Sequence, residues 1–151
     1  MLEITTKSAK ETQKIARMFA EKLIRAPRRG GARVLALQGN LGAGKTTFTQ
    51  GFARALGVKE NVLSPTFVLM KIYPLKKGNF CHLIHIDCYR IASPKDLLHL
   101  GFKELLKDKD AIILIEWADR IKKILSPDAI WLKFTHGAKH NERKIIIEKS
   151  K

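Results

Sequence analysis

Residues 39–47 have the composition and spacing of a phosphate-binding loop. They read Gly-Asn-Leu-Gly-Ala-Gly-Lys-Thr-Thr and match the pattern G-x-x-x-x-G-K-[ST] at every fixed position. Glycine lets the backbone wrap closely around an anion, so that several N–H groups point at one phosphate chain. In such a loop Lys45 places a positive charge against the terminal phosphates, and the hydroxyl of Thr46 is a ligand for Mg²⁺. The predicted nucleotide-binding residues of the loop are Gly39, Asn40, Leu41, Gly42, Ala43, Gly44, Lys45, Thr46 and Thr47.

Two carboxylates follow apolar segments elsewhere in the chain. Asp87 ends a segment that alternates like a strand, with His85 on the same face, and Glu116 ends the run Ala111–Ile115. Acids at the carboxyl ends of strands in a phosphate-loop domain hold Mg²⁺ or polarise the attacking water. We therefore predict that Asp87 and Glu116 are metal ligands and, with Lys45, catalytic residues. The alternative is that each is a solvent-facing acid or an ion-pair partner of a nearby arginine.

A further group of residues, in the segment 81–90, has the chemistry of zinc ligands. Strand alternation puts Cys81, His85 and Asp87 on one face and His82 and Cys88 on the other. One tetrahedral ion cannot collect ligands from both faces, so we expect no structural zinc site. Two cysteines also argue against a disulfide scaffold and fit a reducing compartment.

Two other residues are weaker candidates for the nucleotide site. Trp117 follows Glu116 and has a ring that could stack on adenine, although a core or partner contact is the more common role of such a residue. Thr66, in the sequence Ser64-Pro-Thr-Phe67, fits a switch loop that senses the γ-phosphate, but a plain turn before a strand explains it nearly as well.

The elements around the loop can be read from hydrophobic periodicity. A short strand, a phosphate loop and a helix are the context that the motif requires. A Ser-x-x-Glu capping box at Ser8 predicts a first helix to about Arg25, and Ser93-Pro94 predicts another that runs to about Leu106. The expected strands are Leu2–Thr5, Val34–Leu37, Phe67–Tyr73, Phe80–Ile86, Ala111–Ile115, Ile130–Phe134 and Lys144–Ile147.

Strands 67–73 and 80–86 are separated by a short turn, so they should pair as an antiparallel hairpin, and so should the last two strands. The helix after the loop should run to about Leu56, before Gly57, and a short helix should follow Glu116. The fold class is α/β: a P-loop NTPase-like, three-layer domain with a mixed parallel and antiparallel central sheet. We expect residues 1–151 to form this single domain.

Charge is the unusual feature of the composition. The chain has 29 Lys and Arg against 14 Asp and Glu, a net charge of +15, which makes tRNA a possible direct partner. The charge is spread along the chain, so a generally basic, solvated surface is an equal explanation. The longest aliphatic run, Ala111–Ile115, is far too short to cross a bilayer, and the first 30 residues lack the apolar region of a signal peptide. We therefore expect a cytoplasmic protein with no membrane partner.

Four motifs together resemble those of the TsaE family, formerly the YjeE family. They are the loop 39–47, Ser64-Pro-Thr-Phe67, His85-Ile-Asp-Cys-Tyr-Arg90 and Glu116-Trp117, and the resemblance covers nearly the whole chain. It implies a small bacterial ATPase required for N6-threonylcarbamoyladenosine in tRNA. Such an ATPase binds the complex of TsaB and TsaD and uses ATP to keep it cycling.

The resemblance also assigns roles to residues. It implies that Lys45 and Thr46 bind phosphate and Mg²⁺, that Thr66 belongs to a switch-like loop, and that Asp87 and Glu116 serve the metal and hydrolysis. Trp117 would lie beside the nucleotide, and Thr12 matches the family's amino-terminal pattern near the base. One position departs from the family: its phosphate loops commonly have an acid where this chain has Asn40.

Two other classes of function use the same features. Small-molecule and nucleoside kinases also have phosphate loops, but they usually need a lid with several arginines, and no such segment lies between Tyr89 and Ile121. The net charge favours an RNA-binding protein with a regulatory nucleotide site. We rank an RNA-binding function below an ATPase, because the charge is spread along the chain and few aromatic residues are present to stack on bases.

Overall fold

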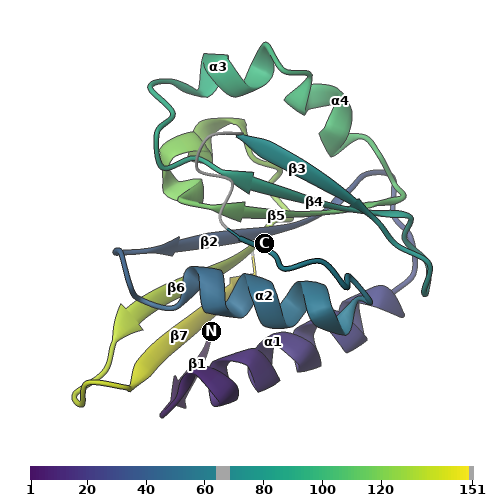
Figure 1. Ribbon diagram of the computed structural model, residues 1–151. Coiled ribbons are helices and arrows are strands. Elements are labelled where there is room, and N and C mark those ends of the chain that lie inside the picture. Colours follow the sequence, from purple (N-terminus) through teal and green to yellow (C-terminus); the bar gives the residue numbers. More distant parts are fainter. Residues whose placement is uncertain (64–68, 150–151) are drawn as a thin grey trace.

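The computed structural model describes residues 1–63 and 69–149, and its described part contains a seven-stranded sheet in the order β1-β7-β6-β2-β5-β4-β3 (Figure 1). The four central strands, β6, β2, β5 and β4, are parallel. Antiparallel β7 and β1 extend one edge, and antiparallel β3 forms the other. The strands are β1 Leu2–Thr6, β2 Arg33–Gly39, β3 Met70–Pro74, β4 His82–Asp87, β5 Ala111–Glu116, β6 Ile130–His136 and β7 Arg143–Lys149.

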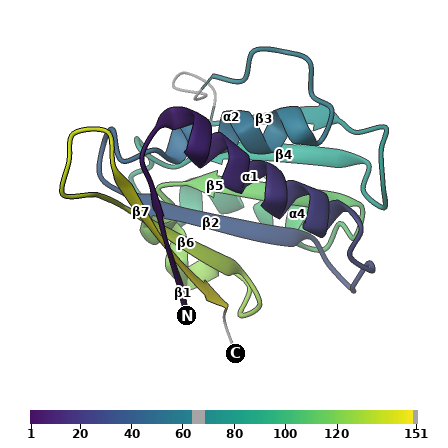
Figure 2. The ribbon, with the colours of Figure 1, turned by 90° about the horizontal axis from the view of Figure 1, so that it is seen from below.

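Helices cover both faces of this sheet, which makes three layers (Figure 1). On one face α1 (Ala9–Ile24) and α2 (Lys45–Ala55) lie side by side, as the view from below also shows (Figure 2). On the other face lie α3 (Pro94–Leu98), α4 (Phe102–Leu106) and the 3₁₀ helix η1 (Ala118–Ile124). The predicted α/β, P-loop-type, mixed-sheet fold is confirmed.

The central strands are apolar because they are buried on both sides. Every residue of β5 is buried, as are the residues 34–37 of β2. Alternate residues face different cores: Leu114 packs under α1 and α2, whereas Ile113 and Ile115 pack under α3, α4 and η1. Continuous hydrophobic runs are typical of parallel strands covered by helices on both faces.

Local signals fix the first two helices. The Ser8 hydroxyl accepts a hydrogen bond from the Glu11 amide at 3.2 Å, and the Glu11 carboxylate accepts one from the Lys7 amide, so the predicted cap is confirmed. Helix α2 starts directly from the loop at Lys45 and is anchored by Phe48. The ring centroid of Phe48 is 5.6 Å from that of Phe134 on β6, so the helix that carries the loop is packed firmly on the sheet.

One predicted helix differs from the structure, and one predicted strand is described only in part. The predicted helix from Ser93 to Leu106 is wrong as a single helix, because Gly101 adopts a left-handed φ of 84° and separates α3 from α4. The predicted strand 67–73 is described only from Met70, where β3 begins, and residues 64–68 lie outside the described part. Both predicted hairpins, β3 with β4 and β6 with β7, are confirmed. In the described part of the chain, no helix is long and apolar enough to cross a membrane.

Candidate functional site

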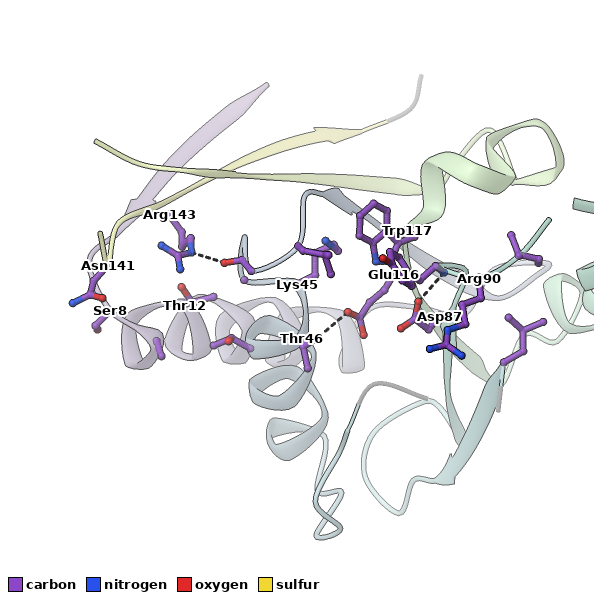
Figure 3. A pocket seen from close by; sticks show the side chains of 18 of the residues that line it. Ser8, Thr12, Lys45, Thr46, Asp87, Arg90, Glu116, Trp117, Asn141 and Arg143 are labelled. Atoms are coloured by element: carbon purple, nitrogen blue, oxygen red, sulfur yellow. Dashed lines mark hydrogen bonds between the residues drawn. The ribbon is translucent and has the colours of Figure 1, made fainter. Parts of the chain in front are cut away.

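A cavity of about 790 Å³ lies where the carboxyl ends of β2, β4 and β5 meet the start of α2. Ligands of open parallel sheets bind at this edge. Figure 3 shows the cavity from close by: Lys45 and Thr46 lie in the middle, Asp87, Glu116 and Trp117 at one end, and Thr12 and Arg143 at the other. The predicted loop and both predicted acids therefore line one cavity.

The loop 39–47 has the backbone of an anion cradle. Gly42 and Gly44 have left-handed φ angles of 75° and 109°, which other residues adopt only with strain. Gly44 precedes the first residue of α2, so the positive end of the helix dipole and its unpaired N–H groups face the cavity. Asn40 and Leu41 are exposed at the outer turn of the loop.

Lys45 is buried, with 5% of its surface exposed, and its ammonium is held by the loop itself. Nζ donates hydrogen bonds to the carbonyl oxygens of Gly39 and Asn40, the second at 3.0 Å, and lies 4.2 Å from the ring centroid of Trp117. Burial lowers the pKa of Lys45 from its ordinary value, while the carboxylate of Glu116 opposes the shift. The ammonium is therefore a buried cation whose direct contacts are neutral groups.

Thr46 and the two acids bring oxygen atoms together. The Thr46 hydroxyl donates to Oε1 of Glu116 at 2.9 Å, as the dashed line between Thr46 and Glu116 in Figure 3 shows. Asp87 and Glu116 are paired in register at the ends of the adjacent strands β4 and β5. Oδ1 of Asp87 accepts a hydrogen bond from the Tyr89 amide at 2.9 Å, which orients this carboxylate.

This donor set suits Mg²⁺ bound together with phosphates. A hydroxyl and two carboxylates are hard oxygen ligands, and Mg²⁺ usually takes one or two carboxylates plus phosphate and water oxygens. Among the described residues, no group of three or more His, Cys, Asp or Glu side chains forms a metal site. The described residues thus offer no complete metal cage, and the absence of a structural zinc site stays an expectation.

Glu116 is also held from its other side. Nε2 of His85 lies 2.6 Å from Oε2 of Glu116, and the two side chains are 1% and 2% exposed. Strand alternation does place His85 and Asp87 on one face of β4, as predicted. The contact with Glu116 comes from the neighbouring strand.

Trp117 has a backbone conformation that is uncommon for a large residue. Its φ is 57°, the one positive value among the described residues other than glycine. This turn after β5 aims the indole at Lys45 and at Tyr89, whose ring centroid is 5.0 Å away. Trp117 therefore forms a wall of the cavity beside the loop lysine.

The other end of the cavity is lined by α1 and by the loop between β6 and β7. Thr12 is buried there, with its hydroxyl 2.7 Å from that of Thr6. Arg143 donates from Nε to the carbonyl of Gly42 at 3.1 Å and so links β7 to the phosphate loop. Asn141 lines the same end.

Comparisons with known proteins support one family. A family model described as "Threonylcarbamoyl adenosine biosynthesis protein TsaE" matches residues 6–145. The chain belongs to the TsaE family. A TsaE of Rickettsia prowazekii is 41% identical over 127 residues, 83% of this chain and 81% of its own length. One from Bacillus subtilis is 37% identical over 114 residues, 76% of this chain and 68% of its own.

A solved structure agrees with this. The crystal structure of YdiB from Bacillus subtilis superposes with a TM-score of 0.77 at 31% identity, covering 99% of this chain and 86% of that one. The resemblance read from four motifs is therefore confirmed as membership of the TsaE family, which serves tRNA threonylcarbamoyladenosine biosynthesis.

This member of the TsaE family brings most of the predicted site residues to one cavity, but Gly39, Asn40 and Ala43 of the loop do not line it. Thr66 lies outside the described residues, and the binding roles of the others stay predictions. Reasoning from the sequence missed Arg143, Asn141 and Ser8, which also line the cavity. A Ser-x-x-Glu cap gave a reason to look at Ser8, but nothing local marks residues 141 and 143.

Proposed function

We propose that this TsaE-family protein is a Mg²⁺-dependent ATPase that binds a TsaB–TsaD type complex and drives it in threonylcarbamoyladenosine modification of tRNA. The observation that carries the proposal is the meeting of Lys45, Thr46, Asp87 and Glu116 at the start of α2. A loop lysine, a loop hydroxyl and strand-end carboxylates are the parts that phosphate-loop NTPases use.

Each residue has a role that follows from its contacts. Lys45 exchanges the carbonyl oxygens of Gly39 and Asn40 for the terminal phosphate oxygens of ATP, a stronger, charge-assisted interaction. Thr46, released from Glu116, would hold Mg²⁺ through its hydroxyl, and Asp87 and Glu116 would hold the same ion directly or through water. Bound Mg²⁺ supplies positive charge against the β- and γ-phosphates.

Base recognition belongs to the opposite end of the cavity in this proposal. Thr12 on α1 and Arg143 on β7 lie on the far side of Lys45 from Glu116 (Figure 3). In this proposal the phosphate loop therefore spans the distance between the base and the terminal phosphate. Trp117 lies against Lys45, so we place its ring beside the phosphates rather than on the adenine.

Slow hydrolysis by the isolated protein is also part of the proposal. Both carboxylate oxygens of Glu116 have a partner in the structure, Oε1 with Thr46 and Oε2 with His85. Each oxygen can accept a further hydrogen bond, but the carboxylate is oriented towards Thr46 and His85, and we propose that it does not orient an attacking water until Thr46 moves. A partner complex that closes over the cavity would exclude water and complete the site.

The test is ATP turnover by the purified protein, with and without a purified TsaB–TsaD type complex. We expect slow hydrolysis alone, acceleration by the complex, and loss of both with Lys45→Ala. Turnover that the complex leaves unchanged, or that survives Lys45→Ala, would overturn the proposal. Transfer of the γ-phosphate to a metabolite instead of water would identify a kinase.

Direct contact with tRNA needs a separate measurement because the charge of +15 attracts any polyanion. Affinity for tRNA is titrated against salt, with and without ATP and the partner complex. Binding that needs the complex supports the ATPase proposal. Tight binding independent of both ATP and the complex, with a steep salt dependence, would instead support an RNA-binding protein.

A further inference from the structure

The pair His85–Glu116 is the most deeply buried pair of ionisable side chains among the contacts described. Nε2 and Oε2 are 2.6 Å apart, and neither side chain exceeds 2% exposure. The contact joins β4 to β5 across 31 residues of sequence. The other oxygen of the same carboxylate, Oε1, accepts the hydrogen bond from Thr46. The Glu116 carboxylate therefore connects His85 on β4 to the phosphate loop.

Stability alone does not account for a histidine at this place. Burying such a pair costs desolvation that its attraction barely repays, and apolar replacements are often neutral or stabilising. His85 also leaves Nδ1 buried without a hydrogen-bond partner among the described residues. Leu83 lies two residues before His85 on the same face of β4 and packs in the hydrophobic core. An apolar residue therefore suffices on this face where only packing is needed.

The geometry shows what the histidine contributes. A carboxylate on a free side chain rotates about its last bond, and one fixed oxygen removes that freedom. With Oε2 held by His85, Oε1 is directed at Thr46, at the first turn of α2. When the Thr46 hydroxyl leaves, Oε1 is freed while Oε2 stays fixed.

We infer that His85 is a positioning residue: it holds the Glu116 carboxylate so that Oε1 faces the metal and water side of the loop. The inference rests on the proposed function, because it gives Glu116 a task at the site of Mg²⁺ and ATP. His85 itself touches neither, since its side chain is 1% exposed and does not line the cavity. Hydrogen bonds behind a ligating carboxylate typically change metal affinity or activity by about 10- to 100-fold when removed.

The chain provides a matched control at the other end of the same strand. His82 lies 3.5 Å from Asp108, again a histidine beside a carboxylate, but both side chains are partly exposed and lie outside the cavity. The variants to compare are His85→Leu, which removes the bond, His85→Gln, which keeps a donor near the Nε2 position, and His82→Leu. The three readouts are nucleotide affinity as Mg²⁺ is titrated, kcat and KM for ATP, and the nucleotide-free crystal structure.

For His85→Leu we expect Mg²⁺-free nucleotide affinity to stay within about 2-fold of wild type. The Mg²⁺ concentration that half-maximally strengthens binding should rise about 10-fold or more, and kcat should fall by a similar factor at unchanged KM. In the crystal, Glu116 should lose its contact with Thr46. His85→Gln should recover most of the Mg²⁺ response and turnover, and His82→Leu should change neither.

A His85→Leu protein with wild-type Mg²⁺ response and an unmoved Glu116 would overturn the inference. Equal impairment of His85→Leu and His85→Gln would also overturn it, because a general packing role predicts that result. If His85→Leu does not fold, His85→Asn replaces it: its shorter amide does not reach Glu116, so it should be impaired where His85→Gln is not.

The outcome is separable from the proposed function. If wild-type protein hydrolyses no ATP even with a partner complex, the ATPase proposal fails. The Mg²⁺ titration and the position of Glu116 in the nucleotide-free variants still decide the role of His85.

Discussion

The two ends of β4 carry similar residues in different surroundings. At the amino end His82 lies 3.5 Å from Asp108, with the side chains 43% and 31% exposed. At the carboxyl end His85 lies 2.6 Å from Glu116, with both side chains buried. Exposed pairs are screened by water and salt, whereas buried groups are costly unless fully paired. Substitutions at the exposed pair should therefore change stability little. At the buried pair, polar side chains are costly, and we attribute their presence to the proposed function.

The same contrast extends to the neighbouring elements. At the amino end Arg28 forms a 2.7 Å ion pair with Asp110, just before β5, and both groups are partly exposed. At the carboxyl end Lys45 is buried and contacts carbonyl oxygens and an indole ring. A cation whose direct contacts are neutral can take up an anion without first breaking an ion pair. The predictions below test this difference between the ends, starting with the largest effect.

Lys45→Ala should abolish most nucleotide binding while leaving the fold intact. Losing one partner of a buried charge pair costs about 4 kcal/mol, or on the order of 1,000-fold in affinity. The free energy of unfolding should change by about 1 kcal/mol or less, because burial already disfavours the charged form of Lys45 in the folded protein. Titration calorimetry and thermal unfolding measure the two quantities. Lys71→Ala, at an exposed pair with Glu60, is the control and should bind nucleotide normally.

Glu116→Gln should lower ATP turnover by about 100-fold, the range expected for a residue that orients or deprotonates the attacking water. Nucleotide affinity without Mg²⁺ should remain, since Lys45 and the loop amides are unchanged. The matched control is Asp108→Asn at the amino end of the sheet, which removes the same charge from the exposed pair with His82. If the control loses as much turnover as Glu116→Gln, the contrast between the ends is wrong.

Contiguous motifs made the centre of the site predictable. The loop 39–47 contains its own glycines, lysine and hydroxyl, and the apolar run before Glu116 located the end of β5. Contacts that depend on strand order were not predictable: Arg143 reaches Gly42 across 101 residues, because β6 pairs with β2 and β7 pairs with β6. The contact of His85 with Glu116 likewise needs the register of β4 on β5. The broken helix had a signal in Gly101, which helix-favouring leucines on either side obscured.

Arg28→Ala should have a small effect on stability and none on the site. Arg28 donates from Nε to the Asn79 carbonyl at 2.6 Å and pairs with Asp110, but both charged groups are partly exposed. We expect a loss of about 0.5 to 1 kcal/mol in the free energy of unfolding, measured by urea denaturation. ATP affinity and turnover should be unchanged. A loss of several kcal/mol would mean that the amino end is as tightly coupled to the fold as the carboxyl end.

The two cysteines lie at the two ends of β4, so their reactivity measures how accessible each end is without any substitution in the site. Cys81 precedes β4 and is exposed, whereas Cys88 follows it and is buried. Burial, helped by the carboxylates of Asp87 and Asp119, raises the pKa of Cys88 to about 12. Because only the thiolate reacts, an aromatic disulfide reagent at about pH 8 should modify Cys81 quickly and Cys88 only after unfolding. Cys81→Ser should remove the fast phase of the reaction. Fast modification of both thiols in the folded wild type would show that the carboxyl end of β4 opens readily to solvent.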